Sequence, residues 1–129
     1  PSAGVATVTC IISAICNLRI RNDIAMTGEV DLRGNAMPIG GLREKTNAAS
    51  REHIKTVFIP QENHKDRVEL PKEITDVLEI VEIKKVTDLF PHVFLENIAE
   101  LKEKIYELTS PKKREEEKKT TARKSRKAV

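Results

Sequence analysis

The first part of the chain is apolar on nearly every side. Between Val5 and Leu18 the residues are mainly aliphatic or small, and the first charge is that of Arg19. A helical segment without a polar face needs cover on all sides, so this pattern predicts a helix buried in a core. Ser2 stands at its beginning, where free backbone N–H groups stabilise negative charge.

The hydrophobic period then changes several times. Residues 26–39 alternate between apolar and polar positions and turn at Gly34-Asn35, which predicts a pair of strands. The other predicted elements are helices at residues 42–53, 62–69, 72–78 and 87–90, and strands at residues 54–59 and 79–83. This order predicts an α/β (α+β) fold, in which helices cover a mixed sheet.

Lys45 falls on the apolar side of the second predicted helix. A helical wheel places it on one arc with Leu42, Ala48 and Ala49. An apolar environment disfavours the charged form of a lysine, so such a lysine can act as a general base. Alternatively, Lys45 lies at the edge of this arc and extends its ammonium group to water, as many surface lysines do.

Ser2 also has two interpretations. A serine before a helix is a favoured N-cap, and most such serines only cap. A serine in this position can instead be a nucleophile if a base removes its proton, and the helix N-terminus would then stabilise the oxyanion. The residue pattern alone does not decide between them.

Four blocks of residues resemble one family in order and spacing. They are Pro1-Ser2-Ala3-Gly4, residues 23–34, residues 38–45 and residues 54–63. Together they closely resemble the proteolytic domain of the Lon family of ATP-dependent serine proteases, from Pro1 to about Phe94. The resemblance implies the two-layer α/β architecture of that domain, with strands that precede the serine missing here.

The resemblance also implies roles for individual residues. Ser2 matches the family's nucleophile and Lys45 its general base, in a dyad that has no histidine. Thr27 matches a hydroxyl that orients the lysine, and Glu29 and Arg33 match supporting positions in the active-site strand. The chain departs from the family pattern at residues 50–53, which alters the end of the lysine's helix and leaves the dyad in place.

For the whole protein, the resemblance implies a ring, a hexamer in this family, that degrades unfolded or regulatory proteins. ATP and Mg²⁺ would be bound by an ATPase module outside this chain, since the chain has no glycine-rich phosphate loop. The chain itself is expected to hold no cofactor. The form of the serine motif implies the cytoplasmic branch of the family or, alternatively, a mitochondrial or other organellar one.

The cysteines, the histidines and the lengths of the apolar runs argue against a disulfide, a metal site and a membrane span. Cys10 and Cys16 lie on one predicted helix, roughly 9 Å apart along its axis, which is beyond the reach of a disulfide. We therefore expect two core thiols in a reducing compartment. The three histidines show no ligand spacing with the cysteines, so no metal site is expected, and no apolar run is long enough to predict a membrane span.

The positive charge of the chain is concentrated at its end. Residues 110–129 hold nine Lys or Arg and three Glu, a net charge of +6, whereas residues 1–109 carry −3. We divide the chain into a partial proteolytic domain at 1–95, an amphipathic helix at 96–109 and a basic tail at 110–129. The composition of the tail predicts disorder. The tail is either simply solvated or a contact for nucleic acid or another acidic surface.

Three classes of function therefore remain. The first is a serine endopeptidase that uses Ser2 and Lys45, and the second is a catalytically silent scaffold that forms rings or binds partners. The third is a nucleic-acid-binding module that uses the basic tail. A scaffold needs neither Ser2 nor Lys45, so the presence of both favours the enzyme.

Overall fold

The computed structural model describes residues 2–109 and 111–128, and the chain forms two units, Pro1–Glu96 and Asn97–Val129. The first unit contains a parallel sheet in the order β1-β4-β5 and a small antiparallel pair, β2-β3. Its strands are β1 (Ile24–Met26), β2 (Glu29–Val30), β3 (Ala36–Met37), β4 (Thr56–Pro60) and β5 (Glu79–Ile83). The predicted α/β class with a mixed sheet and covering helices is confirmed.

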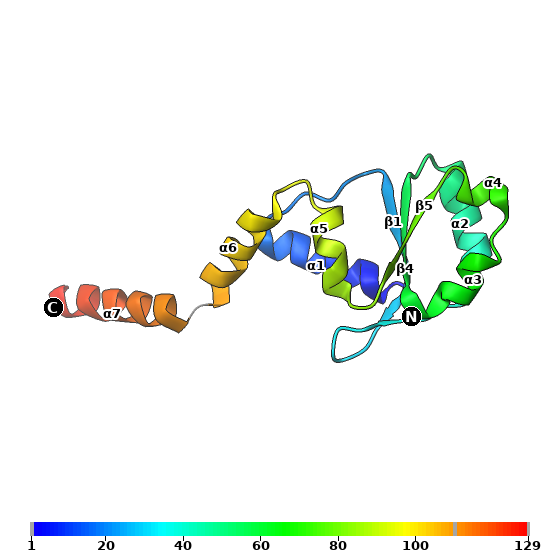
Figure 1. The fold of residues 1–129 in the computed structure, drawn as a ribbon. Helices are drawn as coiled ribbons and strands as arrows, with labels where there is room; N and C mark the ends of the chain where they lie inside the picture. The colour runs from blue at the N-terminus through cyan, green and yellow to red at the C-terminus, as the bar shows by residue number, and fades with distance from the viewer. Residues whose placement is uncertain (1, 110, 129) are drawn as a thin grey trace. The chain divides into compact units, whose positions relative to one another are not determined.

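Helices lie on both faces of the parallel sheet (Figure 1). One face carries α1 (Gly4–Cys16) and α5 (Phe90–Val93), and the other carries α2 (Leu42–Arg51), α3 (His64–Val68) and α4 (Lys72–Thr75). Two short 3₁₀ turns, η1 (Gln61–Asn63) and η2 (Val86–Leu89), complete the unit. No described helix is both long and apolar enough to cross a membrane.

Strand β4 is the centre of the core. All five of its residues are buried, as expected for a strand that has a parallel neighbour on each edge and helices on each face. Val57 and Ile59 point to a cluster that α2 and α4 complete with Leu42, Ala49 and Ile74. Phe58 lies on the opposite face, where its ring is 6.1 Å from that of His92.

Helix α1 is less buried than its sequence predicts. It buries Val5, Thr9 and Cys16, whereas Ile11 and Ile15 are 52% and 67% exposed. Cys10 is also exposed, which corrects the expectation that both cysteines are core thiols. The helix therefore packs through one face, because the described elements contact it from one side only.

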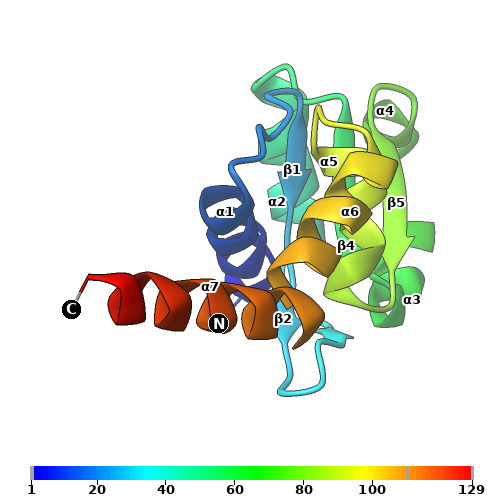
Figure 2. The same ribbon diagram turned by 90° about the vertical axis from the view of Figure 1, so that its left-hand side faces the viewer.

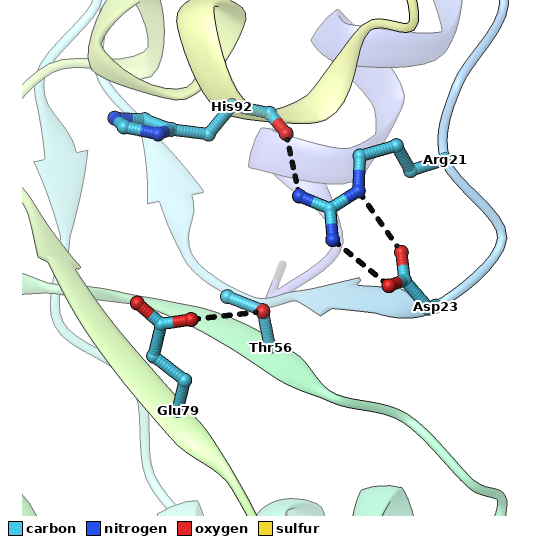
Figure 3. Close-up of polar contacts among 5 residues, drawn as sticks. All are labelled: Arg21, Asp23, Thr56, Glu79 and His92. Carbon is cyan, nitrogen blue, oxygen red and sulfur yellow. Dashed lines mark hydrogen bonds and ion pairs between the residues drawn. The ribbon is translucent and has the colours of Figure 1, made fainter.

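The side chains at the two ends of the parallel strands differ in chemistry. At the amino-terminal ends of the strands, Arg21 donates two hydrogen bonds to the Asp23 carboxylate, at 3.0 and 2.8 Å, and one to the carbonyl of His92, at 3.2 Å (Figure 3). The carboxylate raises the pKa of Arg21, and the guanidinium lowers the pKa of Asp23. The residues singled out from the sequence lie toward the opposite ends of the strands.

The second unit consists of α6 (Ile98–Thr109) and α7 (Pro111–Lys127), seen from another side in Figure 2. Helix α6 lies where the amphipathic pattern predicts a helix. The side chains that make this pattern, Ile98, Leu101, Ile105 and Leu108, lie outside those described.

Helix α7 occupies the segment for which composition predicts disorder. Lys, Arg, Glu and Ala are good helix formers, and proline is favoured at the first helical position.

Asn63 fixes the segment that leads into α2. Its buried amide accepts a hydrogen bond from the backbone N–H of Ile39, at 3.0 Å, and donates to the Ile39 carbonyl and to Asp66, each at 2.8 Å. These bonds satisfy the backbone of a loop that has no strand partner at this point. They hold Ile39, and with it the start of α2, against η1.

We expect Asn63→Ala to lower the unfolding free energy by about 1–3 kcal/mol, because it leaves the backbone groups of Ile39 without their partners. Urea unfolding of the chain measures the loss. The control is Asn47→Ala on the exposed side of α2, which should change stability by less than about 0.5 kcal/mol. Equal stability of the two variants would contradict the role given to Asn63.

Candidate active site

Ser2 precedes α1 and is half-buried. The N-cap position is occupied by Ala3, and no side chain caps the helix. The interpretation of Ser2 as a capping residue is therefore wrong, and its hydroxyl is not committed to the helix end. The positive end of the α1 dipole remains beside it.

Gly28 joins the beginning of α1 to the end of β1 through two backbone hydrogen bonds. Its N–H donates to the carbonyl of Ser2, and its carbonyl accepts from the N–H of Val5, both at 3.0 Å. Gly28 has φ +146°, and a Cβ there would lie 2.8 Å from a methyl of Val5 and 3.1 Å from the ring of Pro60. Only glycine fits this position without displacing its neighbours.

Gly4 brings the same helix close to β2. A Cβ on Gly4 would lie 3.0 Å from the backbone nitrogen of Val30 and 3.4 Å from the Cα of Glu29. The missing side chain lets the first turn of α1 rest on the backbone of the strand. The position of Ser2 is therefore set by backbone contacts with both β1 and β2.

Thr27 comes directly after β1 and is 6% exposed. Its N–H donates to the carbonyl of Phe58 at 3.0 Å, which continues the pairing of β1 with β4. Its hydroxyl lies between the other two predicted residues. Oγ1 donates to the carbonyl of Ser2 at 3.4 Å and accepts from Lys45 Nζ at 3.3 Å.

Lys45 reaches Thr27 from the second turn of α2. The helix follows Gly41, which has φ +73°, and the N–H of Lys45 bonds to the Gly41 carbonyl at 3.1 Å. Lys45 is half-buried, and its Nζ is directed at a buried hydroxyl instead of extending to water. The wheel is correct for Leu42 and Ala49, which are buried. It is wrong for Ala48, which is exposed, because the covered arc is narrower than an idealised wheel suggests.

The structure thus brings together three of the five predicted residues, namely Ser2, Thr27 and Lys45. Glu29 and Arg33 lie apart from this group, in the β2–β3 hairpin. Glu29 is half-buried opposite Met37, and Arg33 is exposed in the turn. In the described structure, neither side chain forms a hydrogen bond or ion pair with the group of three.

The sequence analysis missed the residue that shapes this hairpin, Asp31. One of its carboxylate oxygens accepts from the N–H groups of Arg33 and Asn35, at 2.8 and 2.9 Å, and the other accepts from the Asn35 side chain at 2.9 Å. These bonds, those of the Asn35 side chain above all, hold the pKa of Asp31 below its usual value. An aspartate before a Gly-Asn turn is the signal that could have revealed it.

Comparison with known proteins gives a consistent result. Residues 1–96 match a family model described as the Lon protease (S16) C-terminal proteolytic domain. The chain is 50% identical over 95 residues to a Lon protease of Brucella suis biovar 1 (strain 1330), which covers 74% of the chain and 12% of that protein. It is 42% identical over 111 residues to a Lon protease of Azospirillum brasilense, or 86% of the chain and 14% of that protein. The chain therefore spans only about an eighth of the length of these relatives.

Gly28→Ala should lower the unfolding free energy by about 1–3 kcal/mol, because it forces an alanine into a strained backbone conformation against Val5 and Pro60. The matched control is Gly40→Ala, since a Cβ at Gly40 meets nothing within 4 Å. Urea unfolding compares the two variants. A Gly28→Ala protein as stable as the Gly40→Ala protein would show that α1 is not held in this way.

The lowered pKa of Asp31 predicts a dependence of stability on pH. A carboxyl group whose pKa is lower in the folded state stabilises that state above its unfolded pKa, near 4, and this contribution is lost as the pH falls through the folded value. Asp23 and Glu96, whose pKa values are lowered by their arginine partners, act in the same direction. The unfolding free energy should therefore fall steadily between about pH 5 and pH 2.

Asp31→Asn should reduce this dependence on pH, and urea unfolding at several pH values measures it. The control is Asp76→Asn, because the Asp76 side chain accepts no hydrogen bond in the described structure. An acid profile of Asp31→Asn that matched that of the unchanged chain would contradict the assignment.

Proposed function

The chain belongs to the Lon protease family, and on that premise we propose that it is the catalytic part of a serine endopeptidase that uses Ser2 and Lys45. One observation carries the proposal. Lys45 Nζ lies 3.3 Å from the hydroxyl of Thr27, and the same hydroxyl bonds to the backbone of Ser2. A nucleophile, a candidate base and a hydroxyl that contacts both thus come from three separate elements of the fold.

In the proposed reaction, Ser2 Oγ attacks the carbonyl carbon of the peptide while Lys45 Nζ takes the hydroxyl proton. The resulting oxyanion is stabilised near the positive end of α1. Lys45 then gives the proton to the leaving amine as the C–N bond breaks, which leaves an ester on Ser2. Water attacks this ester, again with Lys45 as the base, and restores the serine.

Thr27 would hold the lysine in place for these proton transfers. A lysine side chain has four rotatable bonds, so its amine needs a fixed partner to stay near the serine. The Thr27 hydroxyl accepts from Nζ and is itself held by its bond to the Ser2 carbonyl. Glu29 and Arg33 would act indirectly, through the hairpin that packs beside the first turn of α1.

The remaining features of the proposal come from family membership. The substrates would be unfolded or regulatory proteins, cleaved inside a ring of subunits. ATP and Mg²⁺ would act at a module beyond the residues of this chain. The cytoplasm would be its location, with an organelle such as the mitochondrial matrix as the alternative.

Ser2→Ala and Lys45→Ala should each reduce peptide hydrolysis by about four orders of magnitude or more, because each removes a reacting group. The assay uses the longest native protein that carries this chain, with a fluorogenic peptide as substrate. Lys55→Ala, at an exposed lysine just before β4, is the control and should retain full activity. Near-normal turnover by the Lys45→Ala protein would contradict the assignment of Ser2 and Lys45 as the catalytic pair.

Two substitutions of Thr27 distinguish a positioning role of its hydroxyl from a merely structural role. Thr27→Val keeps the shape of the side chain and removes the hydroxyl, so we expect kcat to fall by about 10- to 100-fold. Thr27→Ser should restore most of the activity. Failure of Thr27→Ser to exceed Thr27→Val would show that the hydroxyl does not position the lysine.

A further inference from the structure

Ser125 has a charge environment that no other hydroxyl side chain of the sequence shares. It is the centre of Arg123-Lys124-Ser125-Arg126-Lys127, which we call the basic segment. No other serine or threonine has two basic residues on each side. A single hydroxyl therefore lies among four cations that are placed symmetrically along the chain.

The hydroxyl of Ser125 is accessible. The side chain is exposed, as are all the others from Lys118 to Ala128. Its Oγ donates a hydrogen bond to the carbonyl of Ala122, at 3.0 Å. This bond uses the proton of the hydroxyl and not the lone pairs of the oxygen, which are the nucleophilic electrons. At the surface, water can replace such a bond when the hydroxyl turns toward another molecule.

The backbone around Ser125 is also easy to open. Helix α7 ends at Lys127, so the basic segment forms its carboxyl-terminal end. The last carbonyl groups of a helix have no partner within the helix. No side chain from Lys118 to Ala128 is buried, so packing does not hold this turn. An end of this kind unfolds locally at little cost and can enter a groove that binds extended peptides.

The hydroxyl groups of the first unit lack these properties. Four of its threonines are buried, namely Thr9, Thr27, Thr46 and Thr56. Thr75 is exposed, but its neighbours in the sequence include Glu73 and Asp76. Accessibility and positive charge on both sides thus coincide at Ser125.

The charges beside Ser125 indicate the class of enzyme that would recognise it. Protein kinases select their substrates partly by the pattern of charges around the acceptor. Basic residues on both sides fit a kinase whose peptide groove carries carboxylates before and after the acceptor position. Kinases that are directed by acidic residues or by proline find neither after Glu117.

We propose that Ser125 is a phosphorylation site for a protein kinase directed by basic residues. Its Oγ attacks the γ-phosphorus of ATP held by the kinase, and an aspartate of the kinase accepts the hydroxyl proton. The new O–P bond replaces the bond from the γ-phosphorus to the bridging oxygen, and ADP leaves.

The modification would change the charge of the end of the chain. A phosphate on serine carries about −1.5 to −2 charges at pH 7, so the net charge of residues 110–129 would fall from +6 to about +4. The site is separate from Ser2, Thr27 and Lys45, and the inference does not depend on the proposed peptidase activity.

The catalytic domain of protein kinase C, which favours basic residues on both sides of the acceptor, is the probe that tests this proposal. The substrate is the longest native protein that carries this chain, incubated with radiolabelled ATP. Cleavage after Glu117 and mass spectrometry should locate a phosphate at Ser125. Ser125→Ala should remove this phosphate, and Ser125→Thr should restore a phosphate at the same position.

A pair of double variants tests recognition by charge. Arg123→Gln/Arg126→Gln removes one cation from each side and should lower kcat/KM for phosphorylation by about 10-fold or more, because charge-assisted contacts with the kinase are lost. The matched control, Lys118→Gln/Lys119→Gln, removes the same charge from the same helix. Its lysines lie roughly 9–10 Å from Ser125 along the axis, so kcat/KM should stay within about twofold. Glutamine is a good helix former, and circular dichroism checks that α7 is retained.

Three results would overturn the proposal. The first is an equal loss in the two double variants, which would show a response to total charge only. The second is phosphate on Thr120 or Thr121 with none on Ser125. The third concerns the native protein isolated with phosphatase inhibitors, in which we expect the same peptide to carry phosphate at Ser125, and a peptide without it would contradict the assignment.

Discussion

The arrangement of the candidate site depends on the two hydrogen bonds that join Gly28 to the beginning of α1. They fix the carbonyl of Ser2 and the N–H of Val5 to the residue after Thr27, so the serine and the threonine cannot move independently. The bonds form only if the helix comes within hydrogen-bond distance of the strand end. Glycine at positions 4 and 28 permits this approach, since a Cβ at either position would meet its neighbours.

The parallel sheet extends this constraint to Lys45. Strand β4 holds Thr27 through the carbonyl of Phe58 and packs on its other side against α2 through Val57 and Ile59. Asn63, just after β4, fixes the loop from which α2 begins. One buried strand therefore sets the position of both the hydroxyl and the amine, and the hydrogen bond between them follows from the core.

The sequence predicts the α/β class and two of the three strands of the parallel sheet, because residues 54–59 and 79–83 are long enough to show their pattern. Strand β1 is only three residues long and has no period of its own, so the sequence merges it with the hairpin. Ser2 and Lys45 can be singled out by their positions on helices. Their contact with Thr27 cannot, since it depends on the pairing of residues far apart in the chain. Helix α7 lies in the segment for which composition predicts disorder, because its solvated helix formers are also the residues typical of disordered chains.

The position of β4 along the chain has a consequence for biosynthesis. Ser2, Thr27 and Lys45 are all made before Thr56, yet Thr27 takes its place only by pairing with Phe58. A nascent chain that ends before β4 therefore has all three side chains and no strand on which to align them. During translation the arrangement of these three residues is therefore completed only after β4 has left the ribosome.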